Sequence, residues 1–234
     1  MNYFALIDPA LPPAALKKLK QLEIEPLPVP RTSLVDKPIS GHPDIQVFLH
    51  HGTAFVHPDI DKSFLRKLDR YCNLKIGQTH LTADYPGDIP YNIAVTGLFA
   101  FHKKNATDPF VRDYLDDNDI LFIDVRQGYS KCSTLPVNDV SIITSDNSIH
   151  KEAVKNGFDS LLITPGYISL PGYKYGFIGG ATGKFRNSIL FTGEIDLHPD
   201  RDNIYSFIEA RGLSITTLSA EPALDTGSLL ISSY

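Results

Sequence analysis

Residues 132–163 read CSTLPVNDVSIITSDNSIHKEAVKNGFDSLLI, and this stretch decides the fold. Cys132 to Val137 is typical of a strand, Asn138-Asp139 of a hairpin turn, and Val140 to Thr144 of a second strand. Two strands joined by so short a turn must pair antiparallel. The stretch therefore begins with a β-hairpin.

The second half of the same stretch predicts a helix and one more strand. Residues 145–156 have helical spacing, and Gly157 suits the position just after a helix. Residues 160–163 (SLLI) then predict a strand. The repeat is strand, strand, helix, strand.

The same order recurs along the chain. It is found at 44–76, 91–125 and 187–218. In the clearest of these copies, Asp108 precedes Pro109 as a helix cap would, with proline at the first helical position.

The two ends of the chain supply one further copy between them. Residues 3–29 predict a strand, a helix (Pro13 to Gln21) and a strand, whereas residues 224–234 predict one strand around Leu229 to Ile231. Pairing that strand with Tyr3 to Ile7 would complete the unit, close a ring and remove two exposed sheet edges. Deleting the last ten residues should then destabilise the whole protein.

The sequence therefore predicts one α/β domain over residues 1–234, a closed propeller of five strand–strand–helix–strand units. A generic α/β sandwich with coincidental spacing is one alternative. A doubly wound parallel sheet is another, but its strands should be separated by helices, and the hairpins argue against it.

Composition narrows the classes of protein and partner. Hydrophobic residues make up 42% and charged residues 21%, with a net charge of −5, and these values are ordinary for a globular protein. The acidic balance argues against nucleic acid and membrane partners. No signal peptide or membrane span is indicated, and two cysteines form no disulfide framework, so a cytoplasmic location is expected. The oligomeric state stays open.

The repeats resemble those of the pentein superfamily, the five-bladed α/β propellers that include guanidine-modifying enzymes and a ribosome anti-association factor. Residues 92–97 (NIAVTG) and 188–193 (SILFTG) are similar to hairpins of the hydrolases. Residues 127–133 (QGYSKCS) and 176–180 (GFIGG) are more similar to an uncharacterised bacterial pentein-like family. The resemblance implies an amidinotransferase-like fold with a central channel.

The chain departs from the hydrolases where their chemistry lies. The resemblance implies a nucleophilic cysteine in the last repeat, but residues 224–229 read LDTGSL. It implies a histidine in a middle repeat, but residues 129–133 contain none. Asn92 stands where an acidic residue is expected, although Asp88 is near. The usual Cys–His pair is therefore not carried over.

In a ring of this kind, the first strand of each unit lines the channel, so polar residues on those strands are the candidate site. Cys132 and His42 are the candidate catalytic pair, because a nearby base can form the reactive thiolate. The candidate substrate-binding residues are Asp44, Asp88, Asn92, Ser130, Thr182 and Asp225. Strand alternation would place His42, Asp44 and Gln46 on one face. The alternative is a polar plug in which Cys132 only fills space.

Three further patterns predict no separate site. Residues 176–184 (GFIGGATGK) fit neither a dinucleotide fingerprint nor a P-loop, and their glycines more plausibly permit close backbone contact. His50, His51 and His57 lack the arrangement of a metal centre, and Asp200 after His198 reads as a helix cap. No metal and no cofactor are expected.

Two hypotheses of function follow. The first is a small-molecule-binding protein with a polar channel pocket, as a divergent amidine- or guanidine-modifying hydrolase. Its acidic lining would suit a small polar partner, with a cationic one favoured. The alternative is a non-catalytic binding or regulatory protein. Cys132 rather than Cys72 is expected to meet the pocket and to be alkylated faster.

Overall fold

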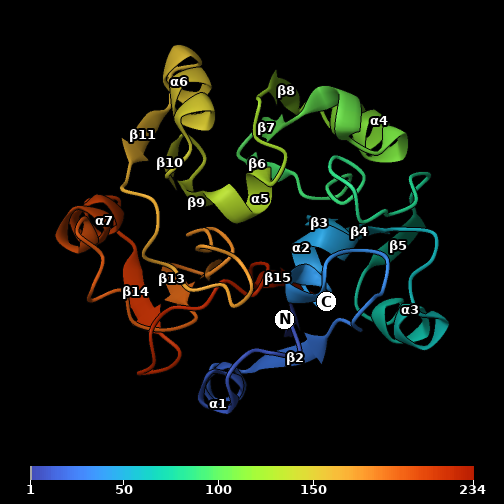
Figure 1. Ribbon diagram of the computed structural model, residues 1–234, viewed down its shortest axis with the longest axis horizontal. Coiled ribbons are helices and arrows are strands. Elements are labelled where there is room, and N and C mark those ends of the chain that lie inside the picture. Colours follow the sequence, from blue (N-terminus) through green and yellow to red (C-terminus); the bar gives the residue numbers. More distant parts are fainter. Residues whose placement is uncertain (1) are drawn as a thin grey trace.

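The computed structural model describes residues 2–234, which form five three-stranded sheets arranged as a ring (Figure 1). The sheets are β1 (Tyr3–Ile7), β2 (Ile24–Pro28) and β15 (Leu230–Ser233); β3 (Val47–His50), β4 (Thr53–Val56) and β5 (Asn73–Ile76); β6 (Ala94–Thr96), β7 (Phe99–His102) and β8 (Leu121–Asp124); β9 (Thr134–Asn138), β10 (Ser141–Thr144) and β11 (Asp159–Leu162); β12 (Thr182–Phe185), β13 (Ser188–Phe191) and β14 (Ser214–Thr217).

All five units have the same topology. In each, the inner strand pairs antiparallel with the middle strand, and the middle strand pairs parallel with the outer one. A parallel pair needs a crossover, and one helix supplies it in every unit. These helices are α1 (Pro13–Gln21), α3 (Lys62–Leu68), α4 (Pro109–Asp117), α6 (Asn147–Lys155) and α7 (Arg201–Glu209). The predicted repeat is confirmed.

The ring closes through the two ends of the chain. Strand β15 pairs antiparallel with β1, with Tyr3 opposite Ser233 and Leu6 opposite Leu230. Among the inner strands, β9 contacts β6 and β12, and β15 contacts β12 and β3. The predicted closure by the terminal strands is therefore confirmed. The five crossover helices α1, α3, α4, α6 and α7 lie on the outside of the ring (Figure 1).

The hydrophobic core lies between neighbouring units and leaves the centre of the ring polar. One cluster of buried side chains joins the second unit to the third, for example Phe48 and Val111. Another joins the fourth unit to the fifth, for example Leu135 and Ile189. Within residues 2–234, no helix has the length and apolar character needed to cross a bilayer.

Two segments predicted as strands are helical turns instead. They are α2 (Pro43–Gln46) and α5 (Ser130–Ser133), which precede β3 and β9; the 3-10 turns η1 (Lys37–Ile39) and η2 (Lys104–Ala106) lie elsewhere. Pro43 occupies a first-turn position, where its fixed φ and missing N–H suit a helix. The expectation that residues 42–46 and Cys132 lie on strands is therefore wrong, and side-chain directions derived from alternation do not hold there.

Candidate active site

Eight polar side chains from four of the five units meet near the centre of the ring, and we call them the central cluster. They are Asp8, His42, Asp44, Asn92, Lys131, Cys132, Asp225 and Ser228. All except Lys131, which is half-buried, are buried. Three of them are carboxylates, so the chemistry of the cluster depends on how their charge is balanced.

Cys132 is held by hydrogen bonds from two other units. Its thiol donates to Oδ2 of Asp44 at 3.0 Å, and Nδ2 of Asn92 donates to its sulfur at 3.2 Å. The Asn92 amide also donates to the backbone carbonyl of Asp44 and accepts from the backbone N–H of Lys131 and Cys132. Asn92 therefore joins α2 to α5 through one side chain.

Lys131 and Ser228 extend this network on the far side of Asp44. The Ser228 hydroxyl lies 2.7 Å from Oδ2 of Asp44 and accepts from the Lys131 ammonium at 3.1 Å. On a strand, Lys131 and Cys132 would point apart. On the helical turn α5 both side chains instead reach the pair formed by Asp44 and Ser228.

His42 lies between two carboxylates. Its Nε2 is 3.9 Å from Oδ2 of Asp8, and its Nδ1 is 4.0 Å from Oδ1 of Asp225. Ligand atoms of His42, Asp44 and Cys132 all lie within 4.8 Å of one another. The two residues predicted as a catalytic pair, His42 and Cys132, are therefore neighbours, but Asp44 is the hydrogen-bond partner of the thiol.

Two glycines allow the backbone to approach these carboxylates and rings closely. Gly227 has φ +68, and a Cβ there would overlap His42. A Cβ at Gly180 would overlap the carboxylate of Asp225. The expectation that glycines of residues 176–184 permit close backbone contact is confirmed, and larger residues at these positions would displace the cluster.

Burial shifts the pKa values of the cluster toward its neutral forms. It raises the pKa of Asp44, and it raises that of Asp225 to about 6 although the backbone N–H groups of Phe177 and Gly227 oppose the rise. Burial and the neighbouring Asp44 raise the pKa of the Cys132 thiol well above its usual value. Burial likewise lowers the pKa of Lys131. The Cys132 side chain is therefore a thiol rather than a reactive thiolate at neutral pH.

The cluster carries more negative than positive charge. Asp8 has a partner in Arg31, whose Nη2 lies 3.6 Å from it. Asp44 and Asp225 share one nearby ammonium, that of Lys131, which influences both. With both carboxylates ionised, one negative charge would be left without a partner among the residues that the structure describes, and such a site favours a bound cation.

A cavity of about 330 Å³ opens onto the cluster, and we call it the aromatic pocket. It is lined by Ile39, His42, Ile45, Tyr129, Cys132, Leu170, Tyr173, Lys174, Tyr175, Phe177 and Asp225. Tyr129 donates its hydroxyl to Asp88, and Tyr173 donates to Asp36 at 3.0 Å. These outer carboxylates hold two of the aromatic side chains in the wall.

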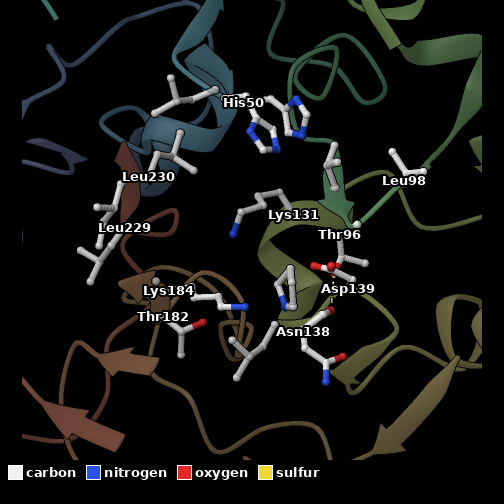
Figure 2. Close-up of a pocket in the computed structure, with 18 residues that line it drawn as sticks. His50, Thr96, Leu98, Lys131, Asn138, Asp139, Thr182, Lys184, Leu229 and Leu230 are labelled. Carbon is white, nitrogen blue, oxygen red and sulfur yellow. Dashed lines mark hydrogen bonds between the residues drawn. The ribbon is translucent and has the colours of Figure 1, made fainter. Parts of the chain in front are cut away.

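A second cavity of about 490 Å³, the lysine pocket, shares no lining residue with the first. Figure 2 shows the Lys131 side chain extending among the residues that line it, which include His50, Thr182 and Lys184. The lysine pocket is larger, and Lys131 and His50, whose pKa values are lowered, line it; the aromatic pocket instead brings together Cys132, His42 and the carboxylate of Asp225. The aromatic pocket is the better candidate for binding chemistry.

Five of the eight predicted site residues are brought together, and three lie apart. His42, Asp44, Asn92, Cys132 and Asp225 belong to the central cluster. Asp88 binds Tyr129 behind the pocket wall, Ser130 donates to the carbonyl of Gln127, and Thr182 lines the lysine pocket. Cys132 lines the aromatic pocket, as expected, whereas Cys72 packs against the core between the first and second units.

The sequence reasoning missed Asp8, Lys131 and Ser228. Ser228 carried a usable signal, because it lies in the last repeat within residues 224–229, where the resemblance led us to look only for a cysteine. Lys131 was missed because a strand through residues 130–132 would point its side chain away from that of Cys132, whereas this segment is the helical turn α5. Asp8 follows directly after β1, a middle strand, whereas the sequence reasoning searched only the inner strands.

Comparisons with known proteins agree with this architecture. The model of a family described as "Family of unknown function (DUF6873)" matches residues 6–230. No curated protein matches the chain.

Three solved structures illustrate the similarity of fold. DDAH from Pseudomonas aeruginosa, a cysteine-to-serine variant complexed with citrulline, has a TM-score of 0.59 at 7% identity, covering 100% of this chain and 98% of that one. Agmatine deiminase from C. jejuni has 0.56 at 10%, covering 98% and 93%. An amidinotransferase from Microseira wollei has 0.55 at 11%, covering 92% and 88%.

Proposed function

This chain belongs to that family of unknown function and has the pentein propeller fold, and from its pocket we propose that it binds a compact organic cation of the guanidine or amidine type. The observation that carries the proposal is the aromatic pocket with the Asp225 carboxylate in its lining, beside a cluster that lacks one positive charge.

The walls of the pocket suit such a ligand. The side chains of Tyr129, Tyr173, Tyr175 and Phe177 line it, and aromatic faces attract a desolvated cation by about 0.5–2 kcal/mol each. Asp225 offers a carboxylate that a planar guanidinium can bind through two parallel hydrogen bonds. Lys174 also lines the cavity, but its side chain is exposed. The similar structures include proteins whose names specify agmatine or dimethylarginine, which supports the same ligand class.

The experiment is a calorimetric titration of metal-free protein with arginine and with citrulline. The two molecules have nearly the same shape, but arginine carries a guanidinium where citrulline carries a neutral urea group. We expect heat of binding with arginine or agmatine and at least tenfold weaker binding of citrulline. Equal affinity for both would contradict a site selected by charge.

A second candidate function is hydrolysis of the bound amidine or guanidine by Cys132. The proximity of Cys132, His42 and Asp44 beside the pocket favours it. The thiolate would attack the amidine carbon, an amine would leave with a proton, and water would then release the thiol. The raised pKa of Cys132 favours binding without turnover.

Release of ammonia or amine from the titrated ligands distinguishes the two candidates. Turnover that is lost in Cys132→Ser, while ligand binding remains, would establish hydrolysis. Binding of the ligand without release of ammonia or amine would favour the non-catalytic role. Two unpaired cysteines also lead us to propose a reducing, cytoplasmic location.

A further inference from the structure

We propose that His42, Asp44 and Cys132 form a binding site for one transition-metal ion, and that the preferred ion is zinc. The proposal begins with two buried polar atoms that have no hydrogen-bond partner among residues 2–234. They are Nδ1 of His42 and Oδ1 of Asp44, on residues that are 2% and 1% exposed. Buried polar atoms are rarely left without a partner, so these two call for an explanation.

The two unpartnered atoms belong to a set with the chemistry of a zinc site. Imidazole nitrogen, carboxylate oxygen and thiolate sulfur are the three protein ligands that zinc takes. The ligand atoms of the three residues lie within 4.8 Å of one another, and Sγ of Cys132 is 3.0 Å from Oδ2 of Asp44. Around a tetrahedral zinc, ligand atoms lie about 3.3–3.8 Å apart, so small side-chain movements close the site.

The remaining atoms of the same residues already have the partners that hold metal ligands in place. Nε2 of His42 lies 3.9 Å from Oδ2 of Asp8, so a small rotation of the ring would give the hydrogen-bonded carboxylate–histidine arrangement found behind many metal sites. Oδ2 of Asp44 keeps the hydroxyl of Ser228 at 2.7 Å. Asn92 donates to the Cys132 sulfur at 3.2 Å, a bond that a thiolate accepts better than a thiol does.

Zinc binding to Cys132 would displace the thiol proton into solvent as the sulfur–zinc bond forms. His42 and Cys132 line the aromatic pocket, so a fourth coordination position would face the cavity. Zinc and an organic cation should therefore compete, and each is tested in the absence of the other.

The test measures metal bound to the whole chain. Protein stripped with EDTA, reloaded with zinc and desalted is analysed by mass spectrometry for metal content, and cobalt is substituted in parallel. We expect about one zinc per chain and a near-ultraviolet cobalt–thiolate absorption band. Cys132→Ser should lose the band, and Asp44→Asn and His42→Ala should bind zinc at least tenfold more weakly. Cys72→Ser is the matched control and should retain both signals.

Two outcomes would overturn the proposal: no metal retained by folded wild-type protein, or an unchanged cobalt band in Cys132→Ser. Circular dichroism shows which variants are folded. If a variant is unfolded, the melting temperature of the wild-type protein still tests the proposal. Zinc binding to the folded state must raise that temperature in proportion to the logarithm of the zinc concentration. The readouts are metal content and absorption, so they are independent of guanidinium binding.

Discussion

At Asp225, burial and two backbone hydrogen bonds act on the same pKa in opposite directions. Burial raises it to about 6, while the N–H groups of Phe177 and Gly227, at 2.8 Å and 3.0 Å, favour the ionised form. The carboxylate is therefore charged at neutral pH and protonated in mildly acidic solution. Any ligand attracted by this charge must lose affinity in that range.

We predict that arginine binding to metal-free protein weakens as pH falls through 6. Only ionised Asp225 attracts the guanidinium, so its affinity should be retained above pH 7 and fall about tenfold by pH 5, since one pH unit below the pKa leaves about a tenth of the group ionised. Calorimetry at a series of pH values gives the profile. Asp225→Asn should bind weakly with little pH dependence. A variant with the wild-type profile would exclude Asp225 as the contact.

A second residue-scale prediction concerns the thiol. Cys132 is 3% exposed and its pKa is raised well above the usual value, and the pKa of half-buried Cys72 is raised to about 12. Both should react slowly with iodoacetamide, contrary to the expectation from sequence that Cys132 reacts faster. Asp44→Asn removes a carboxylate that opposes the thiolate, so Cys132 labelling should accelerate several-fold in metal-free protein.

Peptide mapping of the labelled protein separates the two cysteines, and Cys72 serves as the internal standard. Its rate should be the same in wild type and Asp44→Asn. An equal rise at both cysteines would indicate general loosening of the protein, and an unchanged Cys132 rate would mean that burial alone keeps the thiol unreactive.

Among the elements, the start of helix α4 is joined by Asp108 to the loop at residues 78–79. The carboxylate of Asp108 caps α4 by accepting from Phe110 and Val111, and its other oxygen accepts from the backbone N–H of Gln78 and Thr79. It is fully buried. Helix α3 begins with a similar cap, Asp61, which accepts from Phe64 at the surface.

Asp108→Ala should therefore lower the free energy of unfolding by about 3 kcal/mol, because it removes a cap and takes the acceptor from four backbone N–H groups that are buried or half-buried at this site. Asp61→Ala should cost clearly less, because water can replace its single exposed cap. Urea unfolding of both variants measures the difference. Equal losses would show that the loop at residues 78–79 does not depend on Asp108.

The sequence predicted best those elements whose pattern lies within one continuous stretch of residues. Helix α1 has the bounds Pro13–Gln21 that were expected, because proline marks its start and apolar spacing its length. The turns α2 and α5 were missed, because four residues carry too little periodicity to distinguish a turn from a strand. Ser228 was missed because its partner Asp44 lies 184 residues away in sequence.

For the whole molecule, closure of the ring is the property that matters most. The strand–strand–helix–strand repeat predicted this closure, because the unit formed by the two chain ends could be completed only by pairing Tyr3–Ile7 with the last strand. The cluster side chains come from five separate segments of the chain. Their positions relative to one another therefore could not be predicted from any one segment.

Removing residues 230–234 should destabilise the entire ring while leaving Asp225 and Ser228 in the chain. The deletion takes away β15, exposes the edge of β1 and removes Leu230 from the core cluster that it shares with Phe4. We expect a loss of several kcal/mol in unfolding free energy. Thermal unfolding followed by circular dichroism measures it, with deletion of Tyr234 alone as the control. Melting at the wild-type temperature would mean that β15 is dispensable.

The central cluster takes side chains from four units, and the backbone carbonyl of Gly179, just before β12, accepts from Ser228, which has a consequence for cooperativity. No unit contains a site by itself, so local opening of any one unit destroys the same site. A molecule or ion that binds at the centre therefore stabilises every unit against opening by the same linkage free energy. Its binding should appear as slower amide hydrogen exchange in all five sheets, including strands that lie far from the bound group.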